Sequence, residues 1–240
     1  MIRENPLSQQ HTISAKTKTF NLVCKPIIMM RDKYKDIFEA GTDLPLVEDF
    51  YTIQGEGFHT GKPAYFIRIG GCDIGCRWCD SKISWNPKEH RLISVEEVVR
   101  KAVESPAKSV VVTGGEPSLY NLEPLCSELK KHNIENFLET SGAYEITGEW
   151  DWICLSPKEN KAPVASSYKK ANELKVIIFD IEKDFAIAEE HAKLVGDDCL
   201  LYLQSEWSQY VHNVKPIVEY VKNNPKWNIS LQSHKFMRIP

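Results

Sequence analysis

The sequence lacks three features that would place it in a special class of protein. It has no excess of basic charge, because 30 Lys and Arg residues face 33 Asp and Glu residues, so the electrostatic footprint of a nucleic-acid-binding protein is missing. No apolar run approaches the roughly 20 residues that a membrane-spanning helix needs. Its seven cysteines, an odd number, argue against a secreted disulfide scaffold. We therefore expect a cytoplasmic protein without a nucleic-acid or membrane partner.

The remaining composition is that of an ordinary globular chain, with 42% hydrophobic and 26% charged residues. A length of 240 residues makes one domain the default. The beginning of the chain reads differently, since residues 8–19 are polar without periodicity and Lys25 and Pro26 interrupt the apolar stretch that follows. That stretch is a poor signal-peptide core. We expect an N-terminal extension over residues 1–45, disordered over residues 1–28, and one domain over residues 46–240.

From residue 46 onward, strand patterns alternate with helix patterns. Ser94 and Glu97 form a capping box in front of an apolar helix face. We expect further helices over 122–132, 181–195 and 209–222, and strands over 47–53, 64–69, 109–113, 136–140, 152–155, 173–179, 199–203 and 227–232. The connections 140–151 and 157–172 are too short for full helices. The predicted fold class is α/β, a partial (β/α) barrel, in which chemistry gathers at the C-terminal ends of the strands.

A dense group of cysteines follows the second predicted strand. Cys72, Cys76 and Cys79 form a C-x3-C-x2-C array in a glycine-containing stretch. Thiolates at this density select zinc or an iron–sulfur centre. A closed zinc site wants four ligands and an ordinary [4Fe–4S] cluster wants four cysteines, yet no fourth ligand follows Cys79 at suitable spacing. A cluster held by three cysteines leaves one iron open for another molecule. A zinc knuckle with a distant ligand, or three buried thiols, are the alternatives.

Charged residues also occur inside predicted strands. Arg68 alternates with the apolar residues of its strand and faces the opposite side from Ile67 and Ile69. A buried Arg needs a partner or an open cavity. Glu173 and Lys175 share one face of their strand, where they either pair with each other inside the barrel or contact a bound cofactor, and we expect the pair. His234 and Lys235 near the end of the chain fit a substrate contact and a surface position equally well. The other cysteines of the domain occupy apolar positions and are expected in the core: Cys126, Cys154 and Cys199.

Together, two motifs resemble those of the radical S-adenosylmethionine (radical SAM) superfamily. One is the cysteine array with Trp78 before its last member, and the other is Gly-Gly-Glu-Pro at 114–117 directly after a strand. In that superfamily the open iron binds the amino and carboxylate groups of SAM. Longer stretches resemble the 7-carboxy-7-deazaguanine synthases: F-Y-T-I-Q-G-E-G at 50–57, D-W-I-C-L-S-P-K at 151–158 and Q-S-H-K at 232–235. The resemblance covers about residues 46–240.

The resemblance implies a radical SAM carbon–nitrogen lyase. It would convert 6-carboxy-5,6,7,8-tetrahydropterin into 7-carboxy-7-deazaguanine with loss of ammonia, in queuosine biosynthesis. The implied cofactors are a [4Fe–4S] cluster, SAM and Mg²⁺, with a flavodoxin or ferredoxin as electron donor, and the implied assembly is a homodimer. A rival enzyme is a radical SAM activase for a glycyl-radical partner, which would not need Arg68 or Ser81. A rival of another class is a zinc-stabilised binding module.

The resemblance also assigns residues to roles. The cluster ligands would be Cys72, Cys76 and Cys79, and the Mg²⁺ ligand Ser81, where many members have Thr. The SAM contacts would be Trp78, Cys79, Asp80, Gly115, Ser156, Pro157, Lys158 and Gln204. The pterin contacts would be Ile53, Gln54, Gly55, Arg68, Thr113 and the terminal carboxylate of Pro240. The stretch from Gln204 to Trp207 lacks the proline expected of close relatives.

Overall fold

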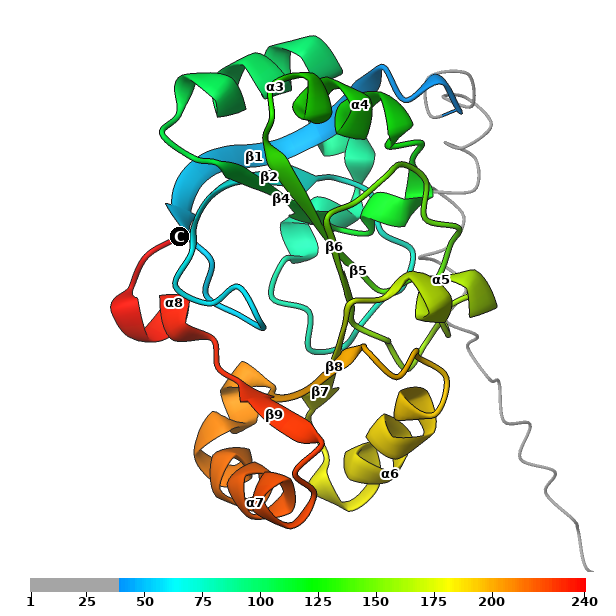
Figure 1. Cartoon of the computed structure of the whole chain (residues 1–240), viewed down its shortest axis with the longest axis vertical. Coiled ribbons are helices and arrows are strands. Elements are labelled where there is room, and N and C mark those ends of the chain that lie inside the picture. Colours follow the sequence, from blue (N-terminus) through cyan, green and yellow to red (C-terminus); the bar gives the residue numbers. More distant parts are fainter. Residues whose placement is uncertain (1–38) are drawn as a thin grey trace, which may run out of the picture.

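A computed structural model describes residues 39–240 of the chain, so the expected disorder of residues 1–28 lies outside the described part. The described residues form one nine-stranded sheet with helices outside it (Figure 1). The strands are β1 (Asp43–Ile53), β2 (Pro63–Ile69), β3 (Arg91–Ser94), β4 (Ser109–Gly114), β5 (Glu135–Thr140), β6 (Trp152–Leu155), β7 (Glu173–Ile178), β8 (Leu200–Ser205) and β9 (Trp227–Ser230). No helix within residues 39–240 is both long and apolar enough to cross a membrane.

The sheet is parallel except at one edge. Its order is β3-β1-β2-β4-β5-β6-β7-β8-β9; β1 runs antiparallel to both β2 and β3, and every other neighbouring pair is parallel. Within the described residues β9 pairs only with β8, so the curved sheet does not close. The predicted α/β fold with a partial barrel is confirmed. The short edge strand β3 was not predicted, because its four residues run directly into a helix cap.

The helices are α3 (Val95–Glu104), α4 (Glu123–Lys131), α5 (Ala165–Lys170), α6 (Ile181–Ala192), α7 (Tyr210–Asn223) and α8 (Ser233–Met237). The capping residue Ser94 accepts a hydrogen bond from the Glu97 amide at 3.2 Å, as the capping box predicts. The connection from β5 to β6 contains no helix and the one from β6 to β7 contains only the six-residue α5. These are the two connections predicted to be too short for full helices, so the outer ring of helices is incomplete there.

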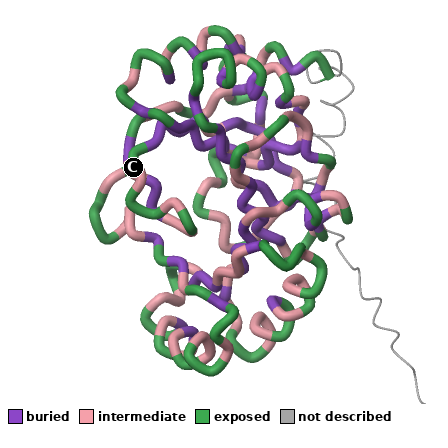
Figure 2. Tube along the Cα trace, viewed as in Figure 1, coloured by how far each residue is buried: buried purple, intermediate pink, exposed green. Residues whose placement is uncertain are grey.

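The core is divided by the sheet. One apolar cluster lies between α3, α4 and the first half of the sheet, with Ile67 and Ile69 pointing into it, and another lies under α6 and α7. On the opposite face of β2, Ala64 and Phe66 pack in a smaller cluster inside the barrel. Figure 2 shows the buried residues concentrated along the strands and the exposed ones along the outer helices. The alternation predicted for β2 is therefore confirmed, and it directs Arg68 inward.

The C-terminal segment fills the gap between β9 and β1. The amide of Ser233 donates to the carbonyl of Gly55 at 2.9 Å, and the amide of Gly57 donates to Ser230 Oγ at 2.9 Å. At the end of the chain, Thr52 Oγ1 donates to the Pro240 carbonyl oxygen at 3.4 Å. In Figure 1 the terminus accordingly lies beside β1. The short helix α8 in this segment was not predicted.

Candidate active site

A cavity of about 260 Å³ lies inside the barrel, at the C-terminal ends of the parallel strands. It is the position that a (β/α) barrel predicts for chemistry. Almost all of the predicted site residues line it: Ile53, Gln54, Gly55, Arg68, Cys72, Cys76, Trp78, Cys79, Asp80, Ser81, Thr113, Gly115, Ser156, Lys158, Gln204 and Pro240. Pro157 is the exception, since it is buried behind the wall and does not line the cavity. Residues from across the chain thus converge on one space.

The cysteine loop, residues 72–79, enters the cavity directly after β2. Its first turn lies against the Gly-Gly-Glu-Pro turn, since the amide of Glu116 donates to the Gly71 carbonyl at 2.8 Å. A Cβ atom at Gly115 would come within 2.3 Å of that same carbonyl oxygen. The motif therefore needs glycine at 115 for a close backbone contact with the cysteine loop, in addition to any approach of a ligand.

The three thiols of this loop face the cavity together. Cys72 is buried, Cys76 and Cys79 are half-buried, and all three line the cavity. Among residues 39–240, no three Cys, His, Asp or Glu side chains are placed to hold one metal ion. In a [4Fe–4S] cluster each cysteine binds a different iron, so its thiols stand further apart than the ligands of a single zinc. Three thiols on one loop facing a cavity are compatible with a three-cysteine cluster that leaves one iron open.

Burial affects the protonation of these thiols. Burial raises the pKa of Cys72 to about 12 and also raises the pKa of Cys76. Both sulfurs therefore keep their protons in the metal-free chain, and binding to iron replaces those protons. Trp85 Nε1 donates to Cys79 Sγ at 3.3 Å, a hydrogen bond of the kind that tunes a cluster's thiolates.

Glu116 of the Gly-Gly-Glu-Pro turn has a structural task. Its buried carboxylate accepts hydrogen bonds from the amide and hydroxyl of Ser118, from the hydroxyl of Thr140, and from the amide and hydroxyl of Ser141. These donors occupy both oxygens and join the end of β4 to the end of β5. Because the Glu116 carboxylate is already occupied, a ligand bound at this turn would contact the backbone of Gly115.

In one corner of the cavity an arginine lies beside a hydroxyl and two carboxylates. Arg68 points into it, donating from Nη1 to Ser81 Oγ at 3.3 Å and from Nε to Glu48 Oε1 at 2.7 Å. Ser81 Oγ in turn donates to Asp80 Oδ1 at 3.3 Å. Glu48 is half exposed, with 51% of its side chain accessible, so its hold on Arg68 is screened by water. The guanidinium remains available to an anionic group in the cavity.

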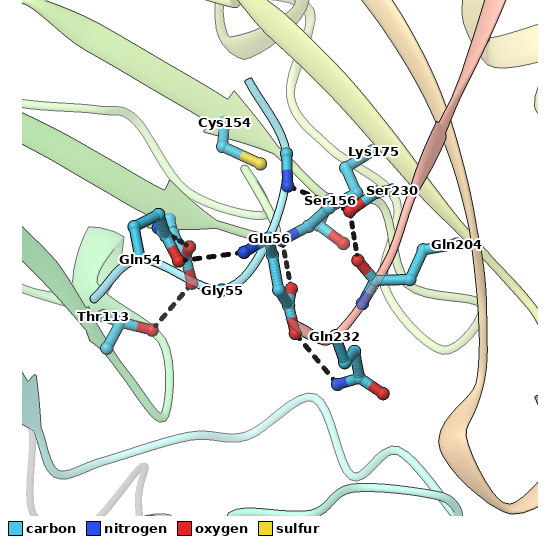
Figure 3. Close-up of polar contacts among 12 residues, drawn as sticks. Gln54, Gly55, Glu56, Thr113, Cys154, Ser156, Lys175, Gln204, Ser230 and Gln232 are labelled. Atoms are coloured by element: carbon cyan, nitrogen blue, oxygen red, sulfur yellow. Dashed lines mark hydrogen bonds and ion pairs between the residues drawn. The ribbon is translucent and has the colours of Figure 1, made fainter. Parts of the chain in front are cut away.

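The floor of the cavity holds a buried ion pair between Glu56 and Lys175 (Figure 3). Lys175 Nζ lies 2.5 Å from Glu56 Oε2, and Gln232 Nε2 donates to Glu56 Oε1 at 2.9 Å. The prediction that Lys175 pairs with Glu173 is therefore wrong. Glu173 instead accepts hydrogen bonds from the Phe58 amide and from the Trp152 indole. Two residues of one strand face lie along that strand, whereas the loop after β1 brings Glu56 directly over Lys175.

The pair is charged on both sides. Burial by itself would raise the pKa of Glu56, but the Lys175 ammonium and hydrogen bonds from its neighbours lower it to about 2. Burial would likewise lower the pKa of Lys175, whereas the acidic groups around it, Cys154 and Glu56 first, raise it well above its ordinary value. Since burial also raises the pKa of Cys154, that thiol is neutral near pH 7 and Glu56 supplies the counter charge.

Opposite this floor, Lys158 lies near the cysteine loop. Its Nζ donates to the carbonyl of Ser156 at 2.8 Å and to Ser156 Oγ at 2.6 Å, and lies 5.6 Å from the ring of Trp78. Burial lowers the pKa of Lys158. Gln204 is buried on the adjoining wall, where its Oε1 accepts from Ser230 Oγ at 2.6 Å. Lys158, Ser156 and Gln204 therefore all face the cavity.

Several lining residues were not predicted as site residues. Glu139 at the end of β5 accepts from Gln54 Nε2 at 3.0 Å and from Thr113 Oγ1 at 3.3 Å. The sequence could have indicated Glu139, because a carboxylate within an apolar strand, like Arg68, needs a partner or an open cavity. His234 and Lys235, for which a surface position was an equal alternative, both line the cavity. The core cysteines Cys126, Cys154 and Cys199 are buried as predicted, although Cys154 also touches the cavity wall: its neighbours there are Glu56 and Glu139.

Comparisons with known proteins identify the family of the chain. Residues 66–152 match the model of the radical SAM superfamily. A 7-carboxy-7-deazaguanine synthase from Flavobacterium psychrophilum is 53% identical over 88% of this chain and all of its own length. One from Synechocystis is 46% identical over 81% of this chain and 93% of its own length. A crystal structure of QueE from Escherichia coli superposes with a TM-score of 0.73 at 30% identity, over 82% of this chain and 97% of that chain.

These likenesses decide between the remaining alternatives. The relatives are named as synthases over their full or nearly full lengths, which leaves no support for an activase of glycyl-radical partners. The superfamily match includes all three cysteines of the loop and the Gly-Gly-Glu-Pro turn, and members of that superfamily use a [4Fe–4S] cluster and SAM. The chain belongs to the 7-carboxy-7-deazaguanine synthase family of the radical SAM superfamily.

Proposed function

We propose that this chain converts 6-carboxy-5,6,7,8-tetrahydropterin into 7-carboxy-7-deazaguanine with loss of ammonia, a step of queuosine biosynthesis. The observation that carries the proposal is the convergence of the cysteine loop with the predicted pterin contacts on one cavity. In a family defined by this reaction, such a convergence supports the whole reaction and not cluster binding alone. The catalytic domain is proposed to be residues 46–240, with residues 1–45 as an extension.

Cys72, Cys76 and Cys79 are proposed to hold the cluster, and SAM to lie beside it. When bound, the cluster and SAM supply the 5′-deoxyadenosyl radical that takes a hydrogen atom from the pterin. The residues proposed to surround SAM are Trp78, Cys79, Asp80, Gly115, Ser156, Pro157, Lys158 and Gln204. Pro157 would act by fixing the direction of its neighbours, because it stands behind the cavity wall.

The corner formed by Arg68 and Ser81 is proposed to receive the substrate carboxylate. A guanidinium binds a carboxylate with two parallel hydrogen bonds. Ser81 is proposed as a protein ligand of Mg²⁺, which takes six oxygen ligands and seldom all from protein. Arg68 donates to Ser81 Oγ at 3.3 Å, so a magnesium ion there would bring two positive centres close together. A substrate carboxylate between them balances that charge, which is why the two proposals support each other.

The opposite end of the pterin is proposed to meet the terminal carboxylate of Pro240. A carboxylate accepts two hydrogen bonds from the adjacent N–H groups of a 2-aminopyrimidinone edge. The bond from Thr52 to the Pro240 carbonyl oxygen holds the terminus at the cavity. The remaining pterin contacts are proposed to come from Ile53, Gln54, Gly55 and Thr113.

An electron donor and an assembly complete the proposal. The family resemblance supports a reduced flavodoxin or ferredoxin as the donor and a homodimer as the assembly. The test of the function is anaerobic turnover of carboxytetrahydropterin with SAM, Mg²⁺ and a reductant. Formation of 7-carboxy-7-deazaguanine and ammonia is the expected result. Cleavage of SAM without that product, in protein with a full cluster, would refute it.

A further inference from the structure

The cysteine loop is held by a part of the chain that does not line the cavity. The three residues between its first two cysteines, Asp73, Ile74 and Gly75, all contact the turn after β6 or the loop after β5. Asn160 Nδ2 donates to the carbonyls of Ile74 at 3.1 Å and Gly75 at 2.9 Å. Lys161 Nζ lies 2.9 Å from Asp73 Oδ2. None of these contacts involves a thiol, a SAM-facing group or a substrate-facing group.

A third side chain joins the ion pair. Tyr144 donates its hydroxyl to Asp73 Oδ2, and the Lys161 ammonium lies 3.9 Å from the centre of the Tyr144 ring. The ring also packs on the apolar cluster that contains Cys72 and Ile74. Asp73 is therefore held by an ammonium and a phenol from two different loops, in a partly buried setting where such contacts are stronger than at the surface.

The middle of the loop needs such support. Gly75 adopts a left-handed backbone conformation with a φ of +70°. Because glycine has no side chain, this residue can also take other backbone conformations when no contact holds it. Three thiols bind one cluster tightly only if the backbone already holds them together. A loop that becomes ordered during binding loses conformational entropy, and this loss weakens the binding. The two carbonyl contacts of Asn160, to Ile74 and Gly75, fix the peptide groups on either side of the Gly75 Cα atom.

We propose that Asn160 and Lys161 form a clasp that presets the cysteine loop for the cluster, with Tyr144 as its support. They are positioning residues, since they act through Asp73, Ile74 and Gly75 and touch neither SAM nor substrate. The inference rests on the proposed function, in which the three cysteines hold the cluster. It predicts that the clasp controls how long the cluster is retained and how it is held.

The test compares three anaerobically reconstituted proteins: the parent, Asn160→Ala with Lys161→Met, and Glu159→Gln. Glu159 is the matched control, because it lies on the same turn but pairs with Lys183 at 3.1 Å and not with the cysteine loop. The readout is the rate at which the visible absorbance of the cluster disappears in an iron chelator. We expect loss about tenfold faster in the double variant, as for removal of a few partly exposed hydrogen bonds, and the parent rate in Glu159→Gln.

Two further measurements separate positioning from general stability. The metal-free double variant should still fold, with a melting temperature below that of Glu159→Gln because Asp73 loses its counter charge, and Lys161→Arg should restore most of the cluster retention lost in Lys161→Met. Removing the Lys161 charge near the cluster should also lower its midpoint potential. If the double variant does not fold, the single variants Asn160→Ala and Lys161→Met decide by the same readout.

The outcomes distinguish the two claims. A parent protein that takes up no iron and sulfide on reconstitution would refute the proposed function. A parent that holds its cluster, with variants that lose theirs at the parent rate, would overturn the clasp and leave the proposed function standing. Faster cluster loss in Glu159→Gln as well as in the double variant would also overturn the clasp. Any change in this turn would then speed the loss, whether or not it touched the cysteine loop.

Discussion

Replacing Lys175 with Met should destabilise the protein more than any exposed lysine change. The variant removes the ammonium from a pair whose side chains are only 5% and 17% exposed. Glu56 then keeps the hydrogen bond from Gln232 but loses its counter charge in a buried place. An unpaired buried carboxylate is expensive because neither water nor an opposite charge compensates its desolvation.

The magnitude follows from the general cost of breaking a buried ion pair. The lowered pKa of Glu56 shows that the folded chain favours its ionised form. Breaking one side of a buried ion pair costs about 3–5 kcal/mol in general. For a chain of this length, roughly 3 kcal/mol lowers the melting temperature by about 6–12 °C. Lys183→Met, which breaks an exposed pair with Glu159, should change it little.

The pH dependence gives the prediction a second arm. Since the folded-state pKa of Glu56 is lowered, its stabilisation is present above the unfolded pKa and is lost as pH falls toward 2. In Lys175→Met burial still raises the pKa of Glu56, and only the hydrogen bonds from its neighbours oppose that rise. Mild acid then protonates Glu56 and removes its unpaired buried charge. The gap in melting temperature between parent and variant should therefore narrow from neutral to mildly acidic pH.

The assay is thermal unfolding of parent, Lys175→Met, Glu56→Gln and the double variant, with Lys183→Met as control. The double variant should recover much of the loss, because it buries no unpaired charge. If Lys175→Met had the same melting temperature as Lys183→Met, the reasoning would be refuted. A double variant no better than Lys175→Met would also refute it, because Glu56 would then not be the partner that matters.

Four further predictions concern the chemistry of the cavity. Cys76→Ala should abolish cluster assembly, measured as iron and sulfide per chain, whereas Cys199→Ala should change only the melting temperature; the reverse pattern would contradict the ligand assignment. Arg68→Ala should weaken pterin binding by about 2–5 kcal/mol with little change in SAM binding, and equal loss of both affinities would indicate a structural arginine. Ser81→Ala should remove most of the Mg²⁺ stimulation of turnover while Ser81→Thr keeps it, and unchanged Mg²⁺ dependence in the Ala variant would exclude Ser81 as ligand. A tag appended after Pro240 should raise KM strongly with the cluster intact, and a native KM in the tagged enzyme would show that the terminal carboxylate binds no substrate.

The sequence predicted those features of the molecule that depend on local pattern. Alternation in β2 correctly directed Arg68 into the barrel, because one residue's shift along a strand reverses its face. The capping box located the start of α3 at Ser94. The cysteine spacing identified the loop, since three thiols within eight residues need no knowledge of distant parts of the chain. In each case neighbouring residues carry all the information.

Features that depend on distant pairing were harder to predict. Lys175 was assigned to the acid on its own strand face, whereas its partner Glu56 lies 119 residues away in a loop. Asn160 and Lys161 carry no motif at all, and their contact with the cysteine loop follows only from the way the connections after β5 and β6 fold back. Such contacts arise from the closing of the barrel, and no pattern within either segment specifies the other.

The incomplete barrel explains why the site extends to the last residue of the chain. The sheet leaves a gap between β9 and β1, and backbone groups there would be exposed without partners. The loop that carries Gly55 and the segment that follows β9 form hydrogen bonds with each other across this gap. One of them runs from the Ser233 amide to the Gly55 carbonyl. A Cβ at Gly55 would come within 2.3 Å of His234 Nδ1, so only glycine allows this approach. The contacts that close the barrel therefore also place Gly55 and Pro240, two proposed pterin contacts, at the same cavity. A change that loosens this closure should reduce pterin binding and stability together, whereas the cysteine loop, held from the other side of the barrel, should keep its cluster.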